Sequence, residues 1–165
     1  MDRIKSYSYL YPGDRVTVVG GFAAYIWIKN KLEKEIEYRD IGILINTNEP
    51  DNVVIERWSN LYTTYQVVYN NNSIVRFKSI VKDNCDYPPI DLFINKDAYT
   101  NTVVIDGYNV PNLRWLIEHH EQTIRGMNEN LDRLAYEGRM DQYDFYVKKQ
   151  QRMDERYQLL LQISI

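Results

Sequence analysis

Three short segments carry residue types that could bind phosphate and a metal ion. Gly20 and Gly21 end an apolar run and open a helical pattern, while Asp40 and Asp91 stand beside two further apolar runs. Glycines at a helix start let the backbone approach a phosphate, and the free N–H groups of the first turn then bind it. Carboxylates on neighbouring strands can share magnesium ions, which hold the attacking and leaving oxygens in nucleotidyl transfer. These segments therefore predict a site for phosphate groups and a divalent metal ion.

The order of these segments resembles the DNA polymerase β-like nucleotidyltransferase superfamily over roughly residues 16 to 95. That pattern has a Gly-Gly or Gly-Ser turn, then a pair of carboxylates on a strand, then a lone Asp on a later strand. The Gly-Gly form is similar to toxin components of abortive-infection systems and, more weakly, to viral poly(A) polymerases. The resemblance implies that Gly20 and Gly21 bind the phosphates of a nucleoside triphosphate (NTP). It also implies that Asp40 and Asp91 are catalytic and bind Mg²⁺.

The sequence departs from this pattern at the second carboxylate, where it has Gly42. In the superfamily that carboxylate bridges two metal ions, so its loss removes charge and geometry from the metal site. Tyr38 and Arg39 stand where a Ser often precedes the pair. Glu37 and Asp86 are candidates to replace the missing ligand.

Other chemically active side chains have simpler interpretations. His119–His120 falls on a predicted helix, with His120 on its apolar seam, and is interpreted as a core pair. Lys148, Lys149 and Arg152 form a basic cluster among acidic residues, which indicates a solvated face of paired charges. Cys85 lacks a second Cys and is interpreted as an inert thiol.

Apolar runs and helical periodicity predict the elements that position these residues. Strands are expected at 16–19, 41–45, 62–69, 74–81, 90–94 and 103–105, and helices at 22–34, 51–61, 113–134 and 143–160. Asn70–Asn72 predicts a hairpin turn, and Gly138 predicts the end of a long helix. Tyr7, Tyr9 and Tyr11 alternate as the residues of a strand do.

These elements predict an α+β fold with a nucleotidyltransferase-like mixed β-sheet, flanking helices and a C-terminal antiparallel helical hairpin. We expect residues 1–110 to form the nucleotidyltransferase-like core. Residues 111–165 should form the hairpin, which packs on the core or serves as an oligomer interface. A homodimer through these helices is one option.

Composition narrows the class of protein. The 165 residues, 44% of them hydrophobic, suffice for one folded domain. The formal net charge of −3 gives no indication of avid nucleic-acid binding, although a local basic patch is compatible with it. No signal peptide or membrane span is visible, and the single Cys excludes an internal disulfide, so we expect a cytoplasmic protein without a membrane partner.

Three hypotheses follow for the function. The first is a minimal nucleotidyltransferase that binds an NTP with Mg²⁺ and transfers a nucleotidyl group to an unknown acceptor. The second is a catalytically degenerate fold that binds a nucleotide or a protein partner, for example in a virus or mobile element. The third is an unrelated α/β domain in which the Gly and Asp positions are coincidental.

Overall fold

The computed structural model describes residues 3–61, 64–71, 74–80, 88–95 and 101–164. Its helices are α1 (Arg3–Leu10), α2 (Gly20–Leu32), α3 (Asp51–Leu61), α4 (Leu113–Tyr136) and α5 (Met140–Ser164). Its strands are β1 (Arg15–Val19), β2 (Ile41–Asn46), β3 (Tyr65–Asn71), β4 (Ile74–Ser79), β5 (Ile90–Ile94), β6 (Thr102–Ile105) and β7 (Tyr108–Pro111). The chain divides into two compact units, one of residues 1–26 and 37–111 and one of residues 27–36 and 112–165.

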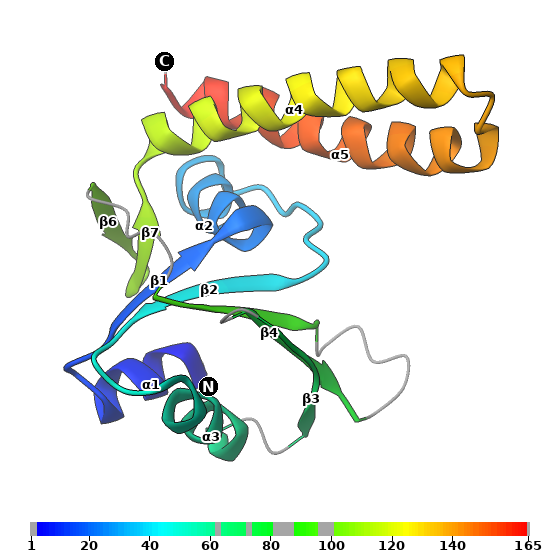
Figure 1. The fold of residues 1–165 in the computed structure, drawn as a ribbon. Helices are drawn as coiled ribbons and strands as arrows, with labels where there is room; N and C mark the ends of the chain where they lie inside the picture. The colour runs from blue at the N-terminus through cyan, green and yellow to red at the C-terminus, as the bar shows by residue number, and fades with distance from the viewer. Residues whose placement is uncertain (1–2, 62–63, 72–73, 81–87, 96–100, 165) are drawn as a thin grey trace. The chain divides into compact units, whose positions relative to one another are not determined.

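The first unit is built around a five-stranded mixed sheet in the order β1-β2-β5-β4-β3. Only β2 and β5 are parallel among these strands, and the other neighbours are antiparallel. Helices α1 and α3 lie side by side on one face of the sheet (Figure 1). Within this unit β6 and β7 form a second, two-stranded sheet beside β1, where Asn109 Nδ2 donates a hydrogen bond of 3.1 Å to Thr17 Oγ1.

The sheet forms where β-branched and aliphatic residues are concentrated. β1 and β2 are rich in Val and Ile, and Val18, Ile43 and Ile45 are almost fully buried. Tyr7 of α1 stacks on Trp58 of α3 with ring centroids 4.6 Å apart, and both side chains are buried. These contacts fix the two helices against one another, and the sheet supplies the rigid frame of the unit.

The N-terminal segment differs from the strand that the alternating tyrosines predict. Residues Arg3–Leu10 form α1, in which Ile4 and Tyr7 are buried while Tyr9 is 86% exposed. Burial at positions i and i+3 is the helical spacing, and Tyr7 packs on Trp58 through it. The strand prediction for Tyr7, Tyr9 and Tyr11 was therefore wrong, because side chains at i and i+2 of a strand share one face, whereas Tyr7 is buried and Tyr9 is exposed.

The second unit contains the helical hairpin, in which α4 and α5 run antiparallel (Figure 1). Asn112 caps α4, since its Oδ1 accepts a hydrogen bond of 2.8 Å from the Trp115 N–H. After α4 ends, Gly138 has a φ of 70°, and its N–H donates to the Ala135 carbonyl at 3.1 Å. A positive φ favours glycine, so the prediction that Gly138 ends the helix is confirmed.

The predicted fold class is confirmed as α+β, with a mixed sheet, flanking helices and a C-terminal pair of packed helices. The hairpin of β3 and β4 is also confirmed, although part of its turn lies outside the described residues. Across the described ranges, no helix combines the length and the apolar character that crossing a membrane requires.

Candidate functional site

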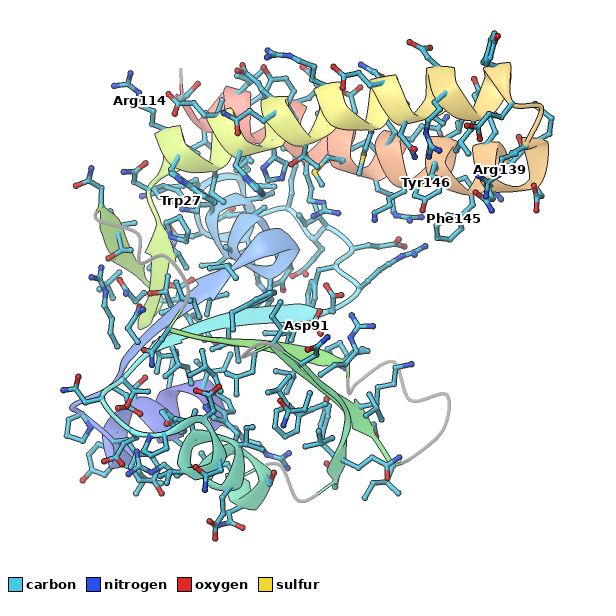
Figure 2. All side chains as sticks on the ribbon, in the orientation of Figure 1. Trp27, Asp91, Arg114, Arg139, Phe145 and Tyr146 are labelled. Atoms are coloured by element: carbon cyan, nitrogen blue, oxygen red, sulfur yellow. The ribbon has the colours of Figure 1, made fainter. Side chains whose placement is uncertain are left out.

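The parallel pairing of β2 and β5 brings the two predicted metal ligands to neighbouring positions. Asp40 directly precedes β2, and Asp91 is the second residue of β5. The register places Ile41 opposite Ile90 and Gly42 opposite Asp91. Both carboxylates therefore stand at the same end of adjacent strands, on the rigid part of the fold. The location of Asp91 on the sheet is labelled in Figure 2.

A guanidinium group lies between these two carboxylates. Arg76 of β4 is the cross-strand partner of Asp91, and its Nε donates to Asp91 Oδ1 at 2.7 Å. Its Nη2 donates to Asp91 Oδ2 and to Asp40 Oδ2, at 2.9 Å in each case. Arg76 thus forms a bidentate pair with Asp91 and a third charged hydrogen bond to Asp40. Two-point pairing of guanidinium with carboxylate is among the stronger polar contacts in proteins.

The Asp40–Arg76–Asp91 cluster, as we name these three residues, is partly shielded from water. The side chains are 43%, 35% and 21% exposed for Asp40, Arg76 and Asp91 respectively. The hydrogen bond to Asp91 raises the pKa of Arg76 above its ordinary value, and the charges of Asp91 and Asp40 raise it further. The guanidinium is therefore a permanent cation held by both carboxylates.

The position of the missing second carboxylate is closed by a neighbouring strand. Gly42 pairs with Val19 of β1, and a Cβ atom built on Gly42 would lie 2.9 Å from Val19 Cγ2 and 3.2 Å from the Val19 carbonyl oxygen. The backbone oxygen cannot move without disturbing the strand pairing. Glycine at position 42 therefore has a steric reason, and an Asp there would not fit the observed packing.

The glycine turn lies next to this position because β1 ends at Val19 and α2 begins at Gly20. Gly20 has a φ of 70°, a conformation that L-residues rarely adopt, and it is exposed. A tight strand-to-helix turn accounts for Gly20 on conformational grounds. Phosphate binding by Gly20 and Gly21 stays a prediction.

Aromatic rings gather between the start of α2 and the residues before Asp40. Phe22 and Tyr25 of α2 each lie 4.9 Å from the ring of Tyr38, measured between ring centroids. The ring of Tyr108 of β7 contacts Phe22 edge-on at 5.8 Å. The cluster packs the entry to β2 against α2, and local patterns give only a weak signal for it, since Tyr38 and Tyr108 come from other segments of the chain than Phe22 and Tyr25.

Replacement ligands for the missing carboxylate are not found within the described ranges. Glu37 is exposed, and no group of three or more His, Cys, Asp or Glu side chains in these ranges could hold a metal ion. Asp86 and Cys85 lie outside the described residues. Mg²⁺ therefore fits the Asp40–Arg76–Asp91 cluster poorly, because the described residues supply two carboxylates at this position and Arg76 already neutralises them.

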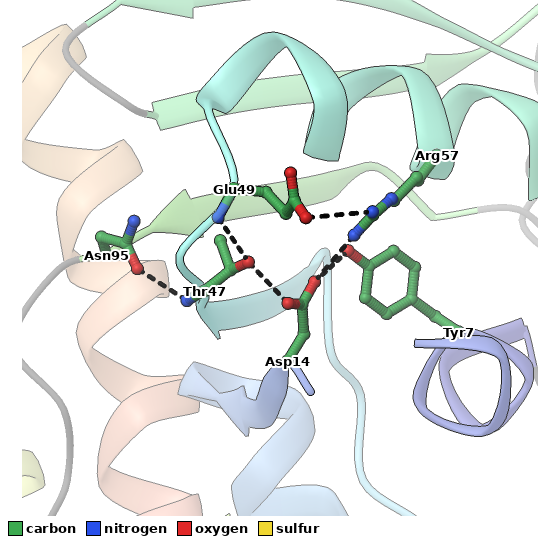
Figure 3. Close-up of polar contacts among 6 residues, drawn as sticks. All are labelled: Tyr7, Asp14, Thr47, Glu49, Arg57 and Asn95. Atoms are coloured by element: carbon green, nitrogen blue, oxygen red, sulfur yellow. Dashed lines mark hydrogen bonds and ion pairs between the residues drawn. The ribbon is translucent and has the colours of Figure 1, made fainter. Parts of the chain in front are cut away.

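A second polar cluster lies at the opposite end of β2 and is shown in Figure 3. The Asp14 side chain is 7% exposed and accepts hydrogen bonds from Tyr7 Oη at 2.7 Å and from Thr47 Oγ1 at 2.5 Å. Arg57 approaches Asp14 at 3.5 Å and Glu49 at 3.6 Å. Burial and the hydrogen bond to Asp14 raise the pKa of Tyr7, so it remains a donor. Every member has a partner, which indicates a structural link rather than a reactive site.

His120 of α4 is a core residue, as its position on the apolar seam predicts, whereas His119 is exposed. His120 is 2% exposed, and its Nδ1 lies 2.8 Å from the Leu116 carbonyl oxygen. Burial lowers the pKa of His120 to about 4, so its imidazole is neutral at physiological pH. His119 stacks on Trp115 with ring centroids 4.7 Å apart. Neither ring lies in a group of metal-ligating side chains in the described part of the chain.

Arg76 is the site residue that sequence reasoning missed. The sequence pattern does indicate its direction. Val75 and Phe77 are both buried, so Arg76 between them points to the other face of the sheet. Recognising its partner required the register between β4 and β5, which local patterns do not specify.

Comparisons with known proteins leave the family open. No protein-family model matches the sequence, and no curated protein matches it. Among solved structures the chain is similar to the crystal structure of JHP933 from Helicobacter pylori, with 14% sequence identity and a TM-score of 0.42. The similarity covers 72% of the present chain and 51% of JHP933, so the chain spans about half the length of that protein. A likeness this distant carries no functional argument.

Proposed function

We propose that the chain is a nucleotidyltransferase-like domain that has lost metal-dependent transfer and acts as a binding module. The observation that carries the proposal is Arg76, whose guanidinium binds both Asp40 and Asp91 where the superfamily pattern would place a divalent ion. The glycine turn, the parallel strands and the two aspartates follow the order of that pattern.

The chemistry of the Asp40–Arg76–Asp91 cluster supports loss of the transfer reaction. A two-metal mechanism needs carboxylates that bridge two cations and hold the attacking and leaving oxygens. Here the guanidinium of Arg76 takes the place of the metal ions, and Gly42 has no side chain that could bind one. A guanidinium can still bind a phosphate or carboxylate of a partner, but it cannot activate a hydroxyl group as a metal ion does.

An active enzyme remains the second candidate because of one distance. Asp40 Oδ2 and Asp91 Oδ2 both lie 2.9 Å from Arg76 Nη2, so they are separated by no more than twice that distance. Carboxylates this close can bind one Mg²⁺ together with the phosphates of an NTP, provided that Arg76 moves away.

Calorimetric titration of the protein with each NTP, first with Mg²⁺ and then with EDTA, tests the proposal. The expected result is no Mg²⁺-dependent binding and no nucleotidyl transfer from α-labelled NTP. The variants are Asp91→Asn and, as a matched control on the exposed surface of α3, Glu56→Gln. Mg²⁺-dependent NTP binding that Asp91→Asn abolishes and Glu56→Gln preserves would refute the proposal in favour of the enzyme.

A further inference from the structure

Strand β3 forms an open edge of the five-stranded sheet. The strand order ends at β3 on one side and at β1 on the other (Figure 1). On the β1 side the edge lies against β7, where Asn109 bonds Thr17. On the β3 side no strand of the described ranges continues the sheet. Among the described strands, β3 is therefore the place at which a further strand can be added.

The backbone of β3 presents hydrogen-bonding groups at this edge. The Ile80 N–H donates to the Thr64 carbonyl oxygen at 2.8 Å, and hydrogen-bonded pairs alternate along an antiparallel ladder. In the register of β3 and β4 the next such pair is Gln66 with Lys78, so the N–H and C=O groups of Val67 point away from β4. Groups in this position bond water or another strand.

β3 lacks most of the features that keep edge strands from pairing. Natural edge strands are commonly short, or they carry charged residues or proline. β3 has seven residues, more than any other strand that the structure describes, and none of them is charged or a proline. Its two adjacent valines, Val67 and Val68, are 41% and 46% exposed. These properties favour contact with another strand over contact with water alone.

The bend and the charge of β3 fit a second copy of the same strand. The register with β4 shifts between Val67 and Tyr69, so a bulge bends β3 around Val68, its middle residue. A regular strand of another protein would have to follow this bend, whereas an antiparallel copy has its own bulge at the same place. An uncharged strand also meets no like charge when it pairs with itself.

We propose that β3 pairs antiparallel with β3 of a second copy of this chain, around a twofold axis near Val68. The two sheets then continue into one another across an isologous interface, which closes at two copies because the β1 edge lies against β7. One strand of seven residues from each copy is far less than the roughly 20–30 residues a side of a stable interface. The dimer is therefore weak and depends on protein concentration.

This inference is independent of the proposed function, because it concerns the backbone edge of β3 and not the side chains of the Asp40–Arg76–Asp91 cluster. Asp91→Asn should therefore self-associate as the wild-type protein does. The interface also differs from a homodimer through α4 and α5, and the two can be told apart by substitution in β3.

Sedimentation velocity of the full chain over about a hundredfold range of protein concentration tests the inference. The expected result is a monomer at low concentration and a dimer at high concentration. Val68→Lys places two like charges near the twofold axis and should raise the dissociation constant of the dimer by about tenfold or more. Val104→Lys is the matched control, since Val104 is a 72% exposed valine on β6 of the same unit, and it should leave the constant unchanged. Circular dichroism checks that each variant is folded.

A cysteine near the axis identifies the strand that pairs. In a Cys85→Ser background, Val68→Cys should form a disulfide-linked dimer under mild oxidation, because each cysteine lies close to its copy in the partner. Val104→Cys in the same background should remain monomeric under these conditions.

Three results would overturn the inference. The first is a monomer at every concentration. The second is a dimer with the same dissociation constant in wild type and Val68→Lys, which would assign the contact to another surface. The third is equal cross-linking of Val68→Cys and Val104→Cys, which would indicate random collision.

Discussion

Replacement of Arg76 by Met separates the two roles that the structure gives this side chain, structural support and neutralisation of two carboxylates. Met retains the length and apolar character of the stem but removes the guanidinium and its three hydrogen bonds to Asp91 and Asp40. We expect a folded variant with lower stability and a new response to divalent ions.

The loss of stability follows from two contributions. Two carboxylate oxygens about 6 Å apart repel one another by about 0.7 kcal/mol in water and by about 3 kcal/mol at an effective dielectric constant of 20. Hydrogen bonds to charged groups contribute about 1.5–3 kcal/mol when they are buried. Because Asp40 and Arg76 are 43% and 35% exposed, both contributions fall near their lower limits. We expect the free energy of unfolding to fall by about 2 kcal/mol.

Divalent ions should restore part of this loss in the variant alone. A ligand at ten times its dissociation constant stabilises a folded protein by about 1.4 kcal/mol. Urea unfolding with and without Mn²⁺, followed by circular dichroism, measures both effects. Lys78→Met, on the same strand and face as Arg76, is the matched control and should show neither effect. Equal stability of wild type and Arg76→Met, or an equal response of both to Mn²⁺, would refute the role of Arg76.

Three further substitutions test other parts of the structure. Because the folded-state pKa of His120 is lowered to about 4 from 6.5, the unfolded state binds a proton first as the pH falls. The free energy of unfolding should fall progressively from pH 6.5 to pH 4, by about 3 kcal/mol in total. His120→Phe should lack this contribution in urea titrations at pH 7 and pH 4.5. The same pH dependence in both proteins would contradict the role of His120. Gly42→Ala should lower the free energy of unfolding by about 1–3 kcal/mol, because its Cβ meets Val19, and thermal unfolding at or above the wild-type temperature would disprove this clash. Asp14→Ala should cost about 2–4 kcal/mol in the same assay, because the buried Tyr7 hydroxyl and the half-buried Thr47 hydroxyl lose their acceptor. A change below about 0.5 kcal/mol would show that the cluster is not structural.

The sequence predicts the fold class well because the signals of the main elements are local. The strands around Val18 and Ile43 are β-branched and buried, and Asn70 and Asn71 end β3 just before the hairpin returns at Ile74. The long helix α4 has a strong apolar seam, an N-cap at Asn112 and Gly138 after its end. In each case one stretch of chain contains the information that fixes the element.

Secondary structure and strand pairing were harder to predict where tertiary contacts decide between two local conformations. Tyr7 and Tyr9 fit a strand or a helix until the ring of Trp58 is in place. Strand β7 is four residues long and ends in Pro111, so its pairing with β6 has little local signal. Its contact with β1 includes the hydrogen bond between Asn109 and Thr17, which are distant in sequence.

The candidate site shows the same division. Local motifs identify Asp40 and Asp91, and the parallel register brings them together as the pattern predicts. The partner Arg76 enters from β4, across an antiparallel register that no motif encodes. The steric reason for Gly42 likewise comes from Val19 on another strand. Residue types and strand order therefore predicted that Asp40 and Asp91 would lie near one another, while the contacts between strands place Arg76 between them.

The claim that Arg76 takes the place of a metal ion between Asp40 and Asp91 is tested most directly by measuring Mn²⁺ binding, with Mn²⁺ as a substitute for Mg²⁺. Bound Mn²⁺ is measured as the loss of the paramagnetic resonance signal of the free ion in the presence of each NTP. We expect wild-type protein to bind no more Mn²⁺ than Asp91→Asn, because Arg76 already holds both carboxylates. Arg76→Met should bind about one additional ion. Binding of one or two Mn²⁺ ions by the wild-type protein with an NTP, lost on Asp91→Asn substitution, would contradict the claim that Arg76 replaces the metal ion.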